Sequence, residues 1–224
     1  MIRFEPAGAE ALLLVLAERP DEALPLRIAA LSERIRAELG ELLIDLVPAW
    51  NTLLLHYDLL RTDHLQLAER LAPLLEAWMD AAAPQAAGRL HEIPLWYAGE
   101  DLAEVARACN LSIAQVIELH AGREYRVGAI GFAPGFAYLG ELDERLALPR
   151  RATPRTRVTA GSLAIAERQT AIYPQASPGG WHLLGLCPWR LFEATRTPPC
   201  PLELGDRVRF VPVDEATYRR ELAR

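Results

Sequence analysis

The chain has 224 residues, and because domains commonly contain about 100 to 150 residues, two domains are expected. Hydrophobic residues make up 51% and charged residues 24%, which is the composition of a globular protein and excludes extensive disorder. The net charge is −6 and no RNP, zinc-finger or basic-helix pattern is present, so nucleic acid is not an expected partner.

All 24 cationic side chains are Arg and none is Lys. This excludes a P-loop lysine, a Schiff-base lysine and a biotinyl-lysine from this chain. The apolar run at residues 11–17 is shorter than the about 20 residues of a membrane span and follows no basic leader, so we expect neither membrane insertion nor export. Three cysteines without paired spacing fit a reducing compartment, and we expect the cytoplasm.

The first ninety-odd residues alternate between strand and helix patterns. Apolar residues at helical spacing predict a helix that ends before Gly40, and Thr62 or Asp63 is the expected cap of a second one. The expected order is strand 11–17, helix 25–39, strands 42–47 and 52–57, a helix from about 63, and strand 90–97. This β-α-β-β-α-β order is that of a ferredoxin-like domain, although its last strand equally suits the start of a second domain.

Residues 81–89 are small and contain Pro and Gly, so they are the expected linker between domains at 1–86 and 87–224. Two helices follow at 101–109 and 112–121, the second with a Ser112/Gln115 capping box and a left-handed exit at Gly122. Short strand patterns at 125–131, 157–166, 170–173, 181–186 and 207–211 favour a closed β-barrel, with a tail helix at 214–222. The predicted fold class is therefore α+β.

Two loops rich in Pro, Gly and aromatic residues stand out. In GFAPGFAYLG, Pro134 and Gly135 are typical of a tight turn in which Gly takes a positive φ, flanked by Phe132, Phe136 and Tyr138. These rings either line a ligand pocket at one end of the barrel or plug that end. SPGGW, residues 177–181, is a second turn of this kind, either a site of close backbone approach to a ligand or a hairpin connection.

Between the two loops the charge is strongly positive. Residues 145–192 contain seven Arg and one acidic residue, Glu167. Arg155 and Arg157 share one face if extended, and Arg150 and Arg151 precede them. Guanidinium groups suit carboxylate or phosphate oxygens, so we predict a site for a small anion, with a solvated basic face as the alternative.

Other chemistries lack support in the residue pattern. There is no GxSxG, since Gly161-Ser162 continues as Leu-Ala, and Cys187 in an apolar strand is expected to be an inert thiol. The five His are scattered without metal-ligand spacing, so no metal site is predicted. His120 ends a helix, where the helix dipole stabilises imidazolium, or it is simply a helix residue.

The run HAGREYRVGAIGFAPGFAYLGELDERLALPRRATPRTRVTAGSLAIAERQTAIYPQASPGGWHLLG, residues 120–185, closely resembles the family of 5-oxoprolinase B-subunits, also called allophanate hydrolase subunit 1 or KipI-like proteins. It also resembles part of the carboxyltransferase region of urea carboxylase. LVPAWNTLLLHYD and HEIPLWYAGEDLAEVARACNLSIAQVIELH extend the resemblance upstream. It implies a small α/β domain followed by a cyclophilin-like β-barrel.

The resemblance further implies a B-subunit that, with 5-oxoprolinase C- and A-subunits, opens 5-oxoproline to glutamate at the expense of ATP, with Mg²⁺ and ATP held jointly with a partner. It suggests His120, Arg155 and Tyr173 as catalytic residues. The residues it suggests for substrate binding are Phe132, Pro134, Gly135, Phe136, Tyr138, Arg150, Arg151, Ser162, Gln169, Ser177, Gly179, Gly180 and Trp181. Glu167 and Ala171 depart from the family pattern, where Gly is frequent. The alternative is a KipI-like inhibitor that docks on a histidine kinase.

Overall fold

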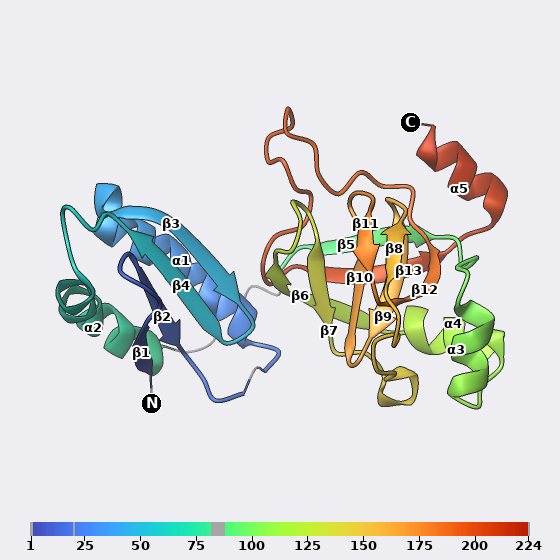
Figure 1. Cartoon of the computed structure of the whole chain (residues 1–224), viewed down its shortest axis with the longest axis horizontal. Coiled ribbons are helices and arrows are strands. Elements are labelled where there is room, and N and C mark those ends of the chain that lie inside the picture. The colour runs from blue at the N-terminus through green and yellow to red at the C-terminus, as the bar shows by residue number, and fades with distance from the viewer. Residues whose placement is uncertain (1, 20, 82–87, 224) are drawn as a thin grey trace. The chain divides into compact units, whose positions relative to one another are not determined.

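The computed structural model describes residues 2–19, 21–81 and 88–223. The chain divides into two compact units, Met1–Gly88 and Arg89–Arg224 (Figure 1). The predicted domain boundary between residues 86 and 87, and most of the predicted linker, lie outside the described residues. Within the described part of the chain, no helix is both long and apolar enough to cross a membrane.

The first unit contains an antiparallel sheet with the strand order β1-β2-β4-β3. Its strands are β1 (Arg3–Pro6), β2 (Ala11–Val15), β3 (Leu43–Ala49) and β4 (Thr52–Tyr57). The expected last strand of the ferredoxin-like order, β5 (Leu90–Leu95), pairs instead with a strand of the second unit, and β1 occupies the sheet edge beside β2. The ferredoxin-like order is thus not completed within the first unit.

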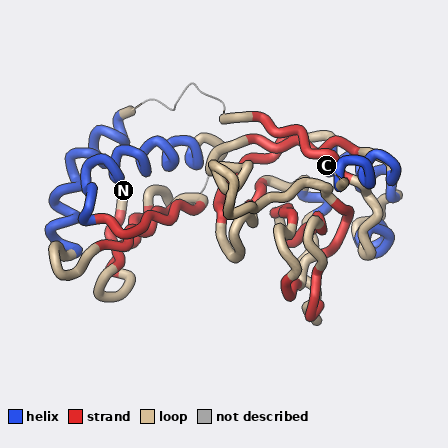
Figure 2. The backbone as a smooth tube through the Cα atoms, turned by 90° about the horizontal axis from the view of Figure 1, so that it is seen from above, coloured by secondary structure: helices blue, strands red, loops and turns tan. Residues whose placement is uncertain are grey.

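Two helices, α1 (Leu24–Leu39) and α2 (His64–Asp80), cover one face of this sheet (Figure 2). Asp63 caps α2, since its carboxylate accepts hydrogen bonds from the Leu65 and Gln66 N–H groups. The predicted apolar faces of both helices are buried, because helical spacing brings these residues onto one side of each helix. The helices are joined by Arg27 and Trp78, each of which donates a hydrogen bond to the other's carbonyl oxygen.

The second unit is built on the strand path β5-β13-β6-β7-β10-β9-β12, in which only the β5–β13 pair is parallel. Among the described residues, β5 and β12 are not paired as strands. The segment that follows β5 meets β12 through an isolated bridge between Trp96 and Leu186 and through single hydrogen bonds from the Gly99 and Asp101 N–H groups. The predicted closed barrel is therefore found as an open ladder. The further strands are β6 (Glu124–Ile130), β7 (Ala137–Gly140), β9 (Ser162–Ala166), β10 (Gln169–Ile172), β12 (His182–Leu186) and β13 (Arg207–Pro212).

The strand predicted over residues 157–166 is in fact two strands. β8 (Arg155–Val158) pairs with β11 (Ser177–Gly179) in a separate two-stranded sheet, whereas β9 belongs to the main ladder. Gly161 separates them at φ +81°, and a Cβ there would lie 2.6 Å from the Cys187 carbonyl oxygen. Only glycine suits such a position. The break in direction carries the arginine-rich segment out of the main ladder.

The second unit also contains three helices, α3 (Leu102–Ala108), α4 (Ile113–Ala121) and α5 (Glu215–Leu222). A short 3-10 turn lies in each unit, at Gly40–Leu42 in the first and at Glu144–Leu146 in the second. The capping box of Ser112 and Gln115 is confirmed. The predicted left-handed exit at Gly122 is wrong: its φ is −75°, and its N–H continues the helical pattern by donating to Glu118. The backbone therefore leaves α4 without entering the left-handed region of φ.

Alternation along the strands gives the ladder two buried faces. Leu163, Ile165 and Ile172 point into the main core, together with residues of α3 and α4. Their neighbours Ala164, Ala171 and Tyr173 point to the opposite face, where a second cluster contains Phe136 and Trp181. The second face brings together the two loops singled out in the sequence.

Candidate functional site

Phe136 lies at the centre of a cluster of aromatic rings and is almost fully buried. Its ring centroid lies 4.8 Å from that of Tyr138, 5.4 Å from Tyr173 and 5.9 Å from Trp181, all edge-on. Phe132 packs against it at 5.3 Å but remains 65% exposed. Most of these rings fill space between loops, whereas Phe132 is presented to the surface.

Both Pro-Gly segments lie at this aromatic cluster, but only the first is a turn: Ser177–Gly179 forms strand β11 and pairs with β8, so the turn predicted at residues 177–181 is wrong. Phe136 N–H donates to the Ala133 carbonyl oxygen, which closes the predicted turn, and Gly135 has the predicted positive φ of +80°. In β11, a Cβ on Gly179 would lie 2.3 Å from Tyr173 Oη. Pro134, Gly135 and Gly179 therefore shape the site by allowing close approach.

Asp101 accepts hydrogen bonds from two arginines, Arg151 and Arg155. Its Oδ1 accepts a hydrogen bond from Arg155 Nη2 at 2.6 Å and from Arg151 Nη1 at 3.0 Å, while its Oδ2 accepts from Leu183 N–H at 2.7 Å. Burial alone would raise the pKa of Asp101, but the hydrogen bonds from Arg155 and Leu183 and the nearby guanidinium charges outweigh it and hold the pKa below its usual value. The carboxylate is therefore ionised and fixes both arginines.

Asp101 was not predicted as a site residue. The sequence indicates only that Asp101 begins a helix. Because it is separated from Arg151 by 50 positions, no local pattern predicts their ion pair. Glu104 also contacts Arg151 at 3.2 Å, and Glu100 contacts Arg155 at 3.4 Å. The arginines are thus not free cations, which reduces the positive potential that the sequence charge suggested.

Several buried polar atoms in this region have no hydrogen-bond partner among the described residues. They are Arg151 Nε, Arg155 Nη1, Ser177 Oγ and His182 Nδ1, and they come from the segment before β8, from β8, from β11 and from the start of β12. Since buried polar groups nearly always find a partner, such a group of orphans indicates a place for a ligand or a partner chain. We call this region the β8 site, defined as Asp101, Arg151, Arg155, Tyr173, Ser177, Gly179, Gly180 and His182.

Further predicted residues border the β8 site. Arg151 N–H donates to the Gly180 carbonyl oxygen at 2.8 Å, and Arg155 pairs with Gly179 across the two-stranded sheet. Arg150 is 61% exposed, with Glu167 3.9 Å away as its acidic neighbour. Arg150 therefore remains available to an anion, more so than Arg151 or Arg155.

Ser162 and Gln169 lie apart from this cluster of orphaned groups. Ser162 is buried, and its hydroxyl is hydrogen bonded to that of Thr159 at 3.0 Å. Gln169 begins β10 and is half-buried. Within the described part of the chain, neither side chain is hydrogen bonded to one of the arginines.

His120 lies in the main core, on the opposite side of the ladder from the aromatic cluster. Thr170 Oγ1 donates to the Ala164 carbonyl oxygen and so accepts from His120 Nε2–H at 3.0 Å. Tyr97 Oη–H then donates to Nδ1 at 2.7 Å. Complete burial, with the charge of Arg123 as a lesser cause, lowers the pKa of His120 to about 3. The imidazole is neutral and fully paired, and the expected stabilisation of imidazolium by the helix dipole does not prevail.

The pH dependence of stability is expected to report His120. Its folded pKa of about 3 lies below the unfolded value of 6.5, so the unfolded chain binds the proton first and stability is lost as the pH falls from 6.5. The slope from this group is about 1.4 kcal/mol per pH unit. Urea unfolding between pH 5 and 7 should show a shallower slope for His120→Gln than for the wild type. A slope for His120→Gln equal to that of the wild type would contradict the assignment.

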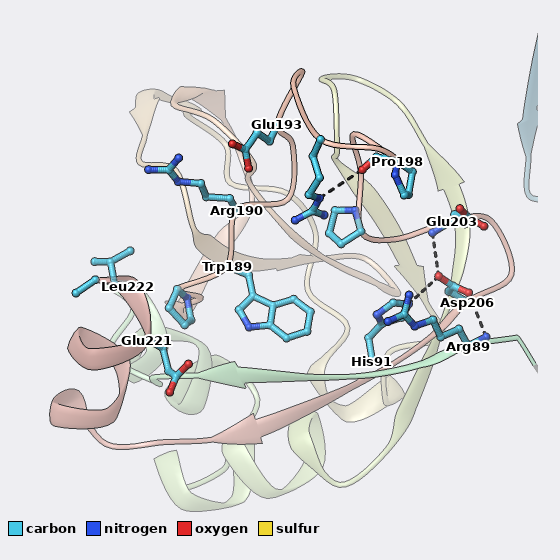
Figure 3. Close-up of a pocket in the computed structure, with 14 residues that line it drawn as sticks. Arg89, His91, Trp189, Arg190, Glu193, Pro198, Glu203, Asp206, Glu221 and Leu222 are labelled. Carbon is cyan, nitrogen blue, oxygen red and sulfur yellow. Dashed lines mark hydrogen bonds and ion pairs between the residues drawn. The ribbon is translucent and has the colours of Figure 1, made fainter.

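A pocket of about 960 Å³ in the second unit was not predicted from the sequence (Figure 3). It lies between β5, α5 and the long loop of residues 188–206. This loop contains no strand or helix, so no periodic pattern in the sequence points to the pocket. His91 and Asp206 form a buried pair in its wall, with Nε2 and Oδ2 2.8 Å apart. Its lining residues are Arg89, His91, Pro188, Trp189, Arg190, Glu193, Arg196, Pro198, Pro201, Glu203, Asp206, Glu221, Leu222 and Ala223.

Comparison with known proteins identifies the class to which this chain belongs. Residues 2–202 match the family described as carboxyltransferase domain, subdomain C and D, and the chain belongs to this family. It is 35% identical to the 5-oxoprolinase B-subunit of Bacillus subtilis (strain 168), over 96% of this chain and 95% of that protein. It is 43% identical to the 5-oxoprolinase B-subunit of Escherichia coli O157:H7, over 77% of this chain and 79% of that protein. The family resemblance stated from the sequence is confirmed.

A solved structure gives the same fold in a longer protein. TTHA0988 is 41% identical with a TM-score of 0.78, and the match covers 96% of this chain but only 40% of that chain. This chain therefore spans less than half the length of that relative.

Proposed function

We propose that this chain is the B-subunit of an ATP-dependent 5-oxoprolinase. The observation that carries the proposal is the 35% and 43% identity, over most of the chain, to two proteins that bear this name. The β8 site adds geometry to it, because residues of the family motif converge there around unpaired donors. We further propose that the first unit is a variant of the ferredoxin-like fold and the second a variant of the cyclophilin-like barrel.

The β8 site suits recognition of a small carboxylate. In 5-oxoproline a carboxylate adjoins a lactam, whose amide carbonyl is a poor electrophile; ATP would supply the phosphoryl group that makes the ring open to hydrolysis. Arg150 and the unpaired N–H groups of Arg151 and Arg155 would bind the carboxylate. Burial raises the pKa of Tyr173, so its hydroxyl would act as a hydrogen-bond donor and not as a base. His120 has no catalytic part in this proposal, because its ring is enclosed in the core.

ATP and Mg²⁺ would be shared with partner subunits. Among the described residues, no group of three or more His, Cys, Asp or Glu side chains is placed to hold a metal ion. Mg²⁺ would therefore take its ligands from phosphate, water and a partner chain. The 5-oxoprolinase C- and A-subunits are the proposed partners, the exposed Phe132 is a candidate contact, and the proposed compartment is the cytoplasm.

Reconstitution tests this function. The chain is purified with and without its C- and A-subunits, and ATP-dependent release of glutamate from 5-oxoproline is measured. Turnover is expected only with all three subunits and ATP, and each omission serves as a control. Absence of turnover in a stable three-subunit complex would reject the proposal. The alternative of a KipI-like kinase inhibitor is not favoured, because the matched relatives are named as enzyme subunits.

Arg150→Gln is expected to weaken substrate binding in the assembled enzyme. The side chain is 61% exposed, so its loss should leave folding intact while the KM for 5-oxoproline rises about tenfold, as for one lost charge-assisted hydrogen bond. Arg61→Gln removes an arginine of the first unit whose side chain is 49% exposed, and it should leave the KM unchanged. An unchanged KM in Arg150→Gln, with assembly intact, would exclude this arginine from the substrate site.

A further inference from the structure

The pocket of Figure 3 is separate from the β8 site. None of the residues that line it belongs to the β8 site, and all of them lie in the second unit. Its volume of about 960 Å³ falls in the range of about 300 to 1,000 Å³ that is usual for small-molecule sites. Size alone thus permits a ligand larger than 5-oxoproline.

One part of the pocket wall is aromatic and flat. Trp189 is half-buried, and in Figure 3 its indole lies between the His91–Asp206 pair and the end of α5, below the loop that carries Glu193 and Pro198. Pro188, Pro198 and Pro201 also line the space. An indole face among rigid proline rings suits a planar aromatic ring, which stacks on tryptophan whatever its substituents.

The remainder of the wall is charged, with both signs present. Arg89, Arg190 and Arg196 are cations that line the pocket. Arg196 Nε donates to the Pro198 carbonyl oxygen at 3.3 Å, which holds its guanidinium group against the loop. Arginine forks are well suited to phosphate oxygens.

The carboxylates of the pocket fall into two kinds. Asp206 is already satisfied, since its oxygens accept from His91 and from the N–H groups of Arg89 and Glu203. Glu193 and Glu203 lie nearer to solvent and can accept hydrogen bonds from hydroxyl groups. A bare phosphate ion would meet repulsion from these acids, whereas a ligand that combines phosphate with hydroxyl donors would use both kinds of side chain.

We infer that this pocket binds a nucleoside phosphate, with the base on Trp189, the phosphates on the arginines and the sugar hydroxyls toward Glu193 and Glu203. Such a ligand combines a ring, an anion and hydroxyl groups, and so uses the whole wall. The inference goes beyond the proposed function, since it concerns a second site and does not require turnover of 5-oxoproline.

Calorimetric titration of the full chain tests the inference, with ADP, adenosine and inorganic phosphate as separate probes. ADP should bind, and Trp189→Leu and Arg196→Gln should each weaken it about tenfold, as expected for one base stack or one charge-assisted contact. Arg157→Gln, which removes an exposed arginine outside the pocket, is the matched control and should bind ADP like the wild type. Arg196→Gln affects an exposed side chain and keeps the test valid should Trp189→Leu fail to fold.

The outcomes separate this site from the proposed function. ADP binding that is unaffected by both pocket variants, or that is weakened equally by Arg157→Gln, would overturn the inference, as would the absence of ADP binding to the folded wild type. Phosphate that binds as tightly as ADP would reject the stacked base. Since no measurement involves the C- or A-subunits, each of these failures leaves the three-subunit reaction to its own test.

Discussion

Asp101→Asn is expected to lower the free energy of unfolding by about 3 kcal/mol, the scale for removing one partner of a buried ion pair. The carboxylate is nearly inaccessible and serves three donors, from Arg151, Arg155 and the Leu183 backbone. An Asn amide presents one oxygen and one NH₂ group, so either Leu183 N–H or the two guanidinium groups would face a donor. Both arginines would also lose a fixed countercharge. Urea unfolding followed by tryptophan fluorescence measures the loss.

Glu104→Gln is the matched control for this prediction. Its carboxylate contacts Arg151 at 3.2 Å but is 54% exposed, so the expected loss is below about 1 kcal/mol. The pH dependence gives a second readout. The folded pKa of Asp101 lies below its usual value of 3.8, so its stabilisation is complete above the unfolded pKa and is lost as the pH falls below it. The difference between wild type and Asp101→Asn should therefore narrow in acid; a difference that persists there would show that the loss is steric.

Elements with local signals were predictable from the sequence. The apolar spacing of Ile28, Leu31 and Ile35 identified α1, and all three are buried as expected. The capping box of α4 and the Pro134-Gly135 turn were also found, because their hydrogen bonds join residues three apart. Each of these features depends on a few residues that are close together in the sequence, so a short stretch of sequence is enough to predict it.

Features that depend on distant partners were not predictable. Gly161 lies between β8 and β9 with a positive φ and close to the carbonyl oxygen of Cys187, and no local pattern shows that neighbour. β7 (Ala137–Gly140) was taken for part of a loop, since its four residues become a strand only by pairing with β6 and β10. The positive charge of residues 145–192 can be read from the sequence. The carboxylate that fixes Arg151 and Arg155 belongs to Asp101, on the segment before α3, and this partner could not be predicted.

Gly135→Ala should lower the free energy of unfolding by about 3 kcal/mol, because two costs add at this residue. Its φ of +80° lies in a region that L side chains rarely adopt, and the new Cβ would lie 2.3 Å from the Leu191 carbonyl oxygen. That contact is with backbone, which cannot move aside as a flexible side chain can. Calorimetric thermal unfolding should show a fall of several degrees, since about 2 to 4 °C is lost per kcal/mol in a chain of this size.

The same loop provides the control. Gly131→Ala places a Cβ where no atom lies within 4 Å, and the backbone there needs no positive φ, so its stability should stay within about 0.5 kcal/mol of the wild type. The contrast between two glycines four residues apart isolates the turn from any general effect of adding a methyl group. Because Gly135 also holds Phe136 in the aromatic cluster, its substitution should loosen the packing of Tyr173 and Trp181 beside the β8 site. Equal stability of the two variants would mean that the loop does not rest on the Leu191 backbone.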